Sequence, residues 1–159
     1  MIDVAIIGAG ELGGLLASLL ASREIARTVH LIDDAGQVAA GKALDIMQAG
    51  PIAPFTTRVS GGTDVSMTAG ATVTVLADRA AGGEWQTGEG LLLLKRLAFG
   101  ASGRLVLCAG AGQRELVERG VRDAGFSRLR LFGTAPEALV SALRAMVALE
   151  TSGSPQDVA

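Results

Sequence analysis

The chain has 159 residues, of which 49% are hydrophobic and 19% charged, and this balance is typical of a folded domain and excludes a disordered chain. Fourteen basic and sixteen acidic residues give a net charge of -2, which argues against the basic surface that nucleic-acid binding requires. A single cysteine and a single histidine exclude an internal disulfide, a cysteine-rich zinc site and a paired-histidine metal site.

The first half of the chain predicts two strand-helix units. An apolar run over 2–7 ends in a glycine-rich turn, and leucines at helical spacing follow over 11–22. A second strand is expected over 28–32, and a second helix over 36–49 ends before Gly50. Strands that are nearly continuous in apolar residues are typical of parallel strands covered on both faces.

The second half continues the alternation of strands and helices. Its last helix is predicted to begin with a capping box, in which Thr134 and Glu137 each accept a hydrogen bond from the other's backbone amide. Strict alternation with short connections predicts a single α/β domain over 1–159, built on one doubly wound parallel sheet of about six strands. The remaining strands are expected over 57–60, 72–77, 105–108 and 129–132, and the remaining helices over 89–99, 114–124 and 134–150.

A glycine motif lies between the first strand and the first helix. In the pattern GxGxxG the first glycine makes a tight turn, the second lets the backbone approach a pyrophosphate, and the third lets helix and strand pack closely. The first helical amides would face the phosphates, although the Glu11 carboxylate competes for the same positive helix end. The pattern predicts a dinucleotide-binding turn of the Rossmann fold; the alternative is a degenerate turn kept only for packing. Its residues are Gly8, Gly10, Glu11, Leu12 and Gly13.

Two acidic residues end the predicted second strand. Asp33 lies about 20 positions beyond Gly13, where an acid is expected to accept the ribose hydroxyls of a dinucleotide. Asp34 adds a negative charge where the 2′-phosphate of NADP would sit, and no arginine is near in sequence. The predicted cofactor is therefore NAD, with Ala77 at the end of the fourth strand as a further contact.

Three segments of the chain resemble the malate/lactate dehydrogenase family. The most specific is GKALDIMQAGP at 41–51, and GAGELGG at 8–14 and LIDD at 31–34 agree with it. The resemblance covers nearly the whole chain and implies the NAD-binding half of such an enzyme, with the family's substrate domain and its catalytic histidine absent from 1–159. It continues through Gly62-Thr63-Asp64, VTVLA at 73–77, Leu131-Phe132-Gly133 and 154–158.

Several positions depart from the family's catalytic pattern. The family's fourth strand leads into an AG-x-PR loop with substrate-binding arginines, but Ala81 and Thr87 stand at the two arginine positions here. Arg79 would replace the first arginine only if the loop shifted in register. In the last helix the family's LD-x-AR motif is missing, and Arg144 falls one place late, about 100° around the helix. The resemblance therefore implies a catalytically incomplete chain, and no catalytic residue is assigned.

Three interpretations of the function remain open. The first is a stand-alone NAD-binding domain that acts as a pseudoenzyme or accessory module. The second is a divergent NAD-dependent oxidoreductase for malate or lactate, completed by another chain or by loop residues such as Arg79 and Glu84. The third is an oligomeric interaction protein whose cleft is empty. Titration with NAD separates the third interpretation from the others, and an assay with malate and lactate identifies the second.

The helix over 36–49 predicts a homo-oligomer, most simply a dimer. Its apolar side chains cover an arc of roughly 160°, wider than the ~100° stripe that one core contact requires. The resemblance implies that this helix meets a partner subunit, and exposed apolar patches usually mark interfaces. The side chains of the arc are Ala39, Ala40, Ala43, Leu44, Ile46 and Met47.

No targeting or membrane segment is expected. The N-terminal apolar run stops at Gly8 without a preceding basic region. No uncharged stretch reaches the ~18 residues of a membrane helix. We therefore expect a cytoplasmic protein with no membrane partner.

Three single residues are further candidates for a role in function. His30 lies in the second strand, away from the nicotinamide end of a bound cofactor, and is expected to be structural or at the surface. Cys108 is expected to be a buried apolar residue, because no basic partner is near to lower the pKa of its thiol. Trp85, in a glycine-rich loop, is compatible with a lid over a ligand, an anchor for a partner or a simple packing contact.

Overall fold

Six parallel strands form one sheet in the computed structural model, which describes residues 1–52, 54–85, 87–100 and 104–158. The strand order is β3-β2-β1-β4-β5-β6, so the chain starts in the middle, builds one half and then crosses over to build the other. This is the predicted doubly wound sheet of the Rossmann fold. The strands are β1 (Ile2–Ile7), β2 (Ala26–Ile32), β3 (Arg58–Gly62), β4 (Val73–Leu76), β5 (Leu105–Cys108) and β6 (Leu131–Gly133).

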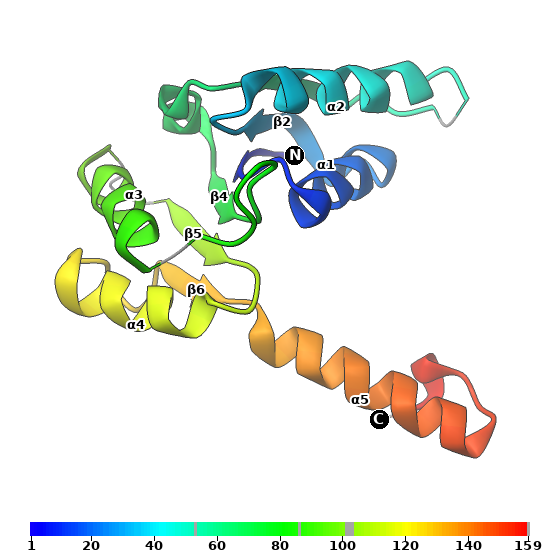
Figure 1. Cartoon of the computed structure of the whole chain (residues 1–159). Helices are drawn as coiled ribbons and strands as arrows, with labels where there is room; N and C mark the ends of the chain where they lie inside the picture. Colours follow the sequence, from blue (N-terminus) through cyan, green and yellow to red (C-terminus); the bar gives the residue numbers. More distant parts are fainter. Residues whose placement is uncertain (53, 86, 101–103, 159) are drawn as a thin grey trace.

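Helices cover both faces of the sheet (Figure 1). The first two helices pack on one face and the next two on the other, each pair over its own apolar core. Short 3-10 helices precede β4 and follow the last α-helix. The elements are α1 (Glu11–Ser22), α2 (Gly36–Ala49), η1 (Val65–Gly70), α3 (Thr87–Gly100), α4 (Gln113–Asp123), α5 (Ala135–Thr151) and η2 (Pro155–Asp157).

The central strand β1 shows why the strands are nearly continuous in apolar residues. Ile6 belongs to the core that faces α1 and α2, whereas its neighbour Ile7 belongs to the core that faces α3 and α4. Both side chains are buried, because successive side chains of a strand point to opposite faces and helices cover both. The strand therefore needs apolar residues at consecutive positions.

The fully buried residues of helix α1 are its small ones. Gly13, Ala17 and Ala21 are buried, while Leu15 is 59% exposed and Leu19 is 40% exposed. Small side chains let the helix approach the sheet closely. Two further leucines, Leu16 and Leu20, pack against the same core while only partly buried, and the other leucines face outward. The apolar spacing thus predicted the helix correctly but did not identify its fully buried residues.

Helix α5 runs away from the sheet (Figure 1) and packs mainly against η2. One side of it is apolar and open, with Leu139, Leu143, Met146 and Leu149 each more than 60% exposed. In the described ranges, no helix combines the length and the apolar character needed to cross a lipid bilayer.

The predicted capping box at the start of α5 is wrong. Thr134 has helical backbone angles, and its hydroxyl caps none of the helix amides that the structure describes. The side chain of Gln113 takes this role, because its Oε1 accepts a hydrogen bond from the Ala135 amide at 2.7 Å. Strand β6 begins two residues later than expected, since the Arg130 amide closes a turn by donating to the Ser127 carbonyl oxygen.

Candidate functional site

The glycine turn between β1 and α1 has the geometry that its motif predicts. Gly8 has a φ of +117°, and a Cβ there would lie 2.5 Å from the Ala77 carbonyl oxygen. A Cβ on Gly13 would lie 2.0 Å from the Gly8 carbonyl oxygen. The first glycine is therefore required by the turn and the third by the contact between helix and strand.

The backbone amides at the start of α1 are occupied by a side chain of the same molecule. The Asp78 carboxylate accepts hydrogen bonds from the Glu11 amide at 2.7 Å and from the Gly13 amide at 3.0 Å. The Gly10 amide donates to the Asp78 carbonyl oxygen, and a Cβ on Gly10 would lie 2.2 Å from the carboxylate. The second glycine of the motif thus allows an anion to approach, and that anion is Asp78.

A lysine also reaches the glycine turn from α2. Lys42 Nζ donates to the Gly10 carbonyl oxygen at 2.6 Å, and its side chain runs along Gly14 of α1. Neither Lys42 nor Asp78 is among the site residues predicted from the sequence. The available signal for Asp78 was its position two residues after the end of β4, at the edge of the sheet where the glycine turn also lies.

Asp33 is buried at the end of β2 and is bound to three backbone amides. Its Oδ2 accepts from Ala9 at 2.7 Å and from Ala80 at 2.9 Å, and its Oδ1 accepts from Ala35 at 2.8 Å. Burial disfavours the charged carboxylate, but the amides of Ala9, Ala80 and Ala35, together with the Arg79 charge, outweigh this effect and hold the Asp33 pKa below its usual range. An ionised carboxylate has about four acceptor positions, so the described residues leave one on Oδ1 unused.

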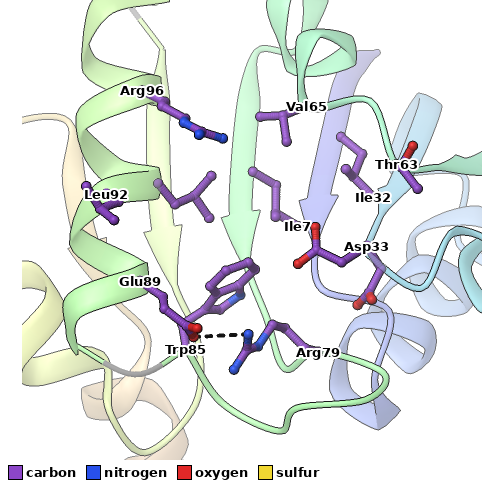
Figure 2. A pocket seen from close by; sticks show the side chains of 12 residues that line it. Ile7, Ile32, Asp33, Thr63, Val65, Arg79, Trp85, Glu89, Leu92 and Arg96 are labelled. Atoms are coloured by element: carbon purple, nitrogen blue, oxygen red, sulfur yellow. Dashed lines mark ion pairs between the residues drawn. The ribbon is translucent and has the colours of Figure 1, made fainter.

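A cavity of about 220 Å³ opens beside Asp33 (Figure 2). Helix α3 forms one wall, and the ends of β1 and β2 form the opposite wall. Its lining combines aliphatic side chains with charged ones. The lining residues are Ile7, Ile32, Asp33, Asp34, Thr63, Val65, Arg79, Trp85, Glu89, Leu92, Leu93 and Arg96.

Arg79 and Trp85 close one end of this cavity (Figure 2). The Arg79 guanidinium lies over the indole ring, with Cζ 4.9 Å from the ring centroid, and pairs with Glu89 at 3.0 Å. Among the described residues, Arg79 Nε and Trp85 Nε1 have no hydrogen-bond partner although both atoms are buried. Trp85 also packs against the core under α3 and α4, so it is at least a packing contact.

Glu84 binds a second group of backbone amides. Its carboxylate accepts from Ala111 at 2.6 Å and from Gly112 at 2.7 Å, directly before α4. Segment 78–84 lies in the connection between β4 and α3. It therefore places the Asp78 carboxylate at the start of α1 and the Glu84 carboxylate at the start of α4. From the sequence, Glu84 is a candidate only as a group that could complete an active site.

The structure brings the other predicted cofactor residues to the same edge of the sheet. Ala77 is buried beside Gly8, and Asp34 is exposed at the rim of the cavity. Leu12 is 39% exposed, while Glu11 contributes its amide to Asp78. Contact of any of these residues with a cofactor stays a prediction.

The remaining candidates lie apart from this edge. His30 Nδ1 is 2.7 Å from Ser60 Oγ, and His30 lines a different cavity with Asp3 at the start of β1. Cys108 is fully buried, and burial raises the pKa of its thiol to about 12, so it carries no thiolate at neutral pH. Arg144 lies exposed on α5.

Comparison with known proteins gives consistent matches. A model of the lactate/malate dehydrogenase NAD-binding domain matches residues 2–92. The malate dehydrogenase of Thioalkalivibrio sulfidiphilus is 32% identical over 170 aligned residues, which cover 99% of this chain and 54% of that protein. The chain spans about half the length of the curated relatives it matches.

Solved structures agree on the fold. Lactate dehydrogenase from Cryptosporidium parvum, complexed with lactic acid and nicotinamide adenine dinucleotide, aligns with a TM-score of 0.84 at 23% identity, covering 99% of this chain and 52% of that one. Malate dehydrogenase from Salinibacter ruber aligns with a TM-score of 0.83 at 23% identity, covering 98% of this chain and 52% of that one.

Proposed function

Because this chain belongs to the family of lactate/malate dehydrogenase NAD-binding domains, we propose that it binds NAD at the carboxyl edge of its sheet. The observation that carries the proposal is the direct contact between the two predicted parts of the site. The Ala9 amide of the glycine turn donates to the buried carboxylate of Asp33. This contact places the turn expected for phosphates beside the acid expected for a ribose.

The adenosine end of NAD fits the cavity beside Asp33. Aliphatic side chains such as Ile32 and Leu92 offer flat contact to a base. The acceptor position that the three amides leave on Asp33 Oδ1 suits one ribose hydroxyl. The NAD-bound relative from Cryptosporidium parvum has the same fold.

The pyrophosphate end does not fit the start of α1 as the structure shows it. The Glu11 and Gly13 amides already donate to Asp78, and a phosphate would have to replace that carboxylate. In the observed geometry, we therefore propose a binding place only for the adenosine end of NAD, in the cavity beside Asp33.

The exposed carboxylate of Asp34 favours NAD over NADP, because a 2′-phosphate would bring a second negative charge to the cavity rim. Calorimetric titration of the wild type should give tighter binding of NAD than of NADP. Asp34→Asn should reduce this difference and leave NAD binding nearly unchanged. Tighter binding of NADP by the wild type would contradict the assignment.

We also propose that residues 1–159 alone do not oxidise malate or lactate at an enzymatic rate. The reaction needs a base for the hydroxyl proton, a cation for the carboxylate and a donor for the developing carbonyl oxygen. Arg79 is paired with Glu89, Glu84 is bound to two amides, and His30 lines the other cavity. These contacts give no support to a catalytic role for the three residues.

NADH absorbance tests this second part of the proposal. Malate and lactate should give less than about one turnover per second, the lower end of common enzyme rates. Faster NADH formation that Arg79→Ala abolishes would favour the divergent oxidoreductase instead.

A further inference from the structure

We propose that Asp78 is a built-in competitor for the phosphates of a dinucleotide, and that it makes this site discriminate against ligands with a pyrophosphate. The inference rests on the proposed nucleotide-binding function. It adds that Asp78 weakens the binding of ligands with a pyrophosphate but not the binding of nucleosides without phosphate.

The competition follows from the hydrogen bonds at the start of α1. The Glu11 and Gly13 amides each have one hydrogen to donate, and both donate to the Asp78 carboxylate at normal distances. A phosphate oxygen that approached these amides would also meet the negative carboxylate at contact distance. Phosphate and carboxylate are alternative anions for one positive helix end, so only one of them can be bound there at a time.

Asp78 is held in this position by the segment around it. The Asp78 carbonyl oxygen accepts from Gly10, and the Arg79 amide donates to the Gly83 carbonyl oxygen at 2.6 Å. The Ala80 amide donates to Asp33, and Glu84 accepts from the two amides before α4. Because the backbone is fixed at several points, the carboxylate loses little conformational freedom when it binds the α1 amides.

The same segment leaves the cavity beside Asp33 open. Asp78 is not among the residues that line this cavity. A nucleoside without phosphate can therefore enter without displacing Asp78, whereas NAD has to displace it. We therefore expect the affinity of the wild type for a ligand to depend on whether the ligand carries phosphate groups rather than on its base.

Calorimetric titration with NAD and with adenosine tests the inference. Asp78→Ala removes the competing carboxylate, and NAD binding should tighten by about 10- to 100-fold, the factor expected from hydrogen bonds to a charged group. Adenosine binding should change by less than about twofold. Asp78→Asn keeps the shape without the charge and should give an intermediate gain for NAD. Asp45→Ala, which removes an exposed carboxylate from α2, is the control for net charge.

Amide chemical shifts give a second readout that does not depend on affinity alone. In Asp78→Ala or Asp78→Asn, NAD should shift the Glu11 and Gly13 amide resonances, whereas adenosine should leave them in place. Equal NAD affinity in the wild type and both Asp78 variants would overturn the inference and leave the proposed function standing. An adenosine gain as large as the NAD gain would also overturn it. Absence of NAD binding in every variant would overturn both.

Discussion

The carboxylate of Asp33 joins three parts of the chain. It binds the glycine turn through Ala9, the start of α2 through Ala35 and the segment after β4 through Ala80. An amide that loses a charged acceptor and gains no other partner lowers the free energy of unfolding. Asp33 is therefore a structural residue as well as the predicted ribose acceptor.

Asp33→Ala should lower both stability and NAD affinity. We expect the free energy of unfolding to fall by roughly 1.5 to 3 kcal/mol, the range for hydrogen bonds to charged groups. Urea unfolding measures this loss, and Asp34→Ala is the matched control because Asp34 is the exposed neighbour. Equal stability of the two variants would show that the three amides find other partners.

The lowered pKa of Asp33 predicts how its contribution depends on pH. The folded pKa lies below the unfolded value of about 3.9, so the stabilisation is complete above pH 4 and is lost as pH falls through the folded pKa. The difference in unfolding free energy between wild type and Asp33→Asn should thus be constant from pH 7 to 5 and shrink below pH 4. If this difference grew as the pH fell, the Asp33 pKa would be raised in the folded state rather than lowered.

Local spacing predicted the residues of the glycine turn and Asp33, because a tight turn and a following acid lie at fixed distances in sequence. The occupation of the α1 amides could not be predicted in this way. Asp78 is 65 positions from Gly13, and the cap that Gln113 places on Ala135 spans 22 positions. Such contacts depend on which strands become neighbours in the sheet.

At the scale of elements, periodicity predicted every strand and helix of the sheet within a few residues, since it depends only on neighbouring side chains. It did not predict which residues of α1 are fully buried. Those residues are set by how closely the helix can approach the sheet, and alanine and glycine allow a closer approach than leucine. Leu15, an exposed leucine of α1, lines a cavity with Ile46 of α2, the helix with the wide apolar arc.

We propose that these two helices form the contact surface of a homodimer. Ala39 and Ala43 are buried within the chain, but Leu44 is 57% exposed and Met47 is 39% exposed. Leu44→Glu should halve the mass measured by sedimentation at micromolar concentration, because it places a charge in an apolar interface. Leu149→Glu on α5 is the matched control and should leave the mass unchanged. A wild-type mass that stays monomeric at every concentration would contradict the proposal.

At the scale of the whole molecule, the sheet separates two cores of different composition. The core under α1 and α2 contains alanines such as Ala17, whereas the core under α3 and α4 contains leucines such as Leu94. Both side chains are fully buried. The core under α1 and α2 therefore has no room for larger side chains, whereas the core under α3 and α4 depends on large side chains to fill it.

The two cores should be destabilised by opposite changes in side-chain size. Leu94→Ala should reduce the unfolding free energy by about 2 to 5 kcal/mol through a cavity. Ala17→Leu should reduce it by about 1 to 3 kcal/mol through overpacking, although the new residue is more apolar. Leu149→Ala, at an exposed position, should change it by less than about 0.5 kcal/mol in urea unfolding. A stabilising Ala17→Leu would show that α1 can move away from the sheet.

The attachment of segment 78–84 at both ends also affects the rate of ligand binding. If phosphates reach α1 only in molecules whose segment has opened, the apparent dissociation constant equals the intrinsic constant divided by the open fraction. Association with NAD should then become independent of NAD concentration at high concentration, where opening of the segment limits the rate. Adenosine, which does not need the α1 amides, should bind at a rate that keeps rising in proportion to its concentration.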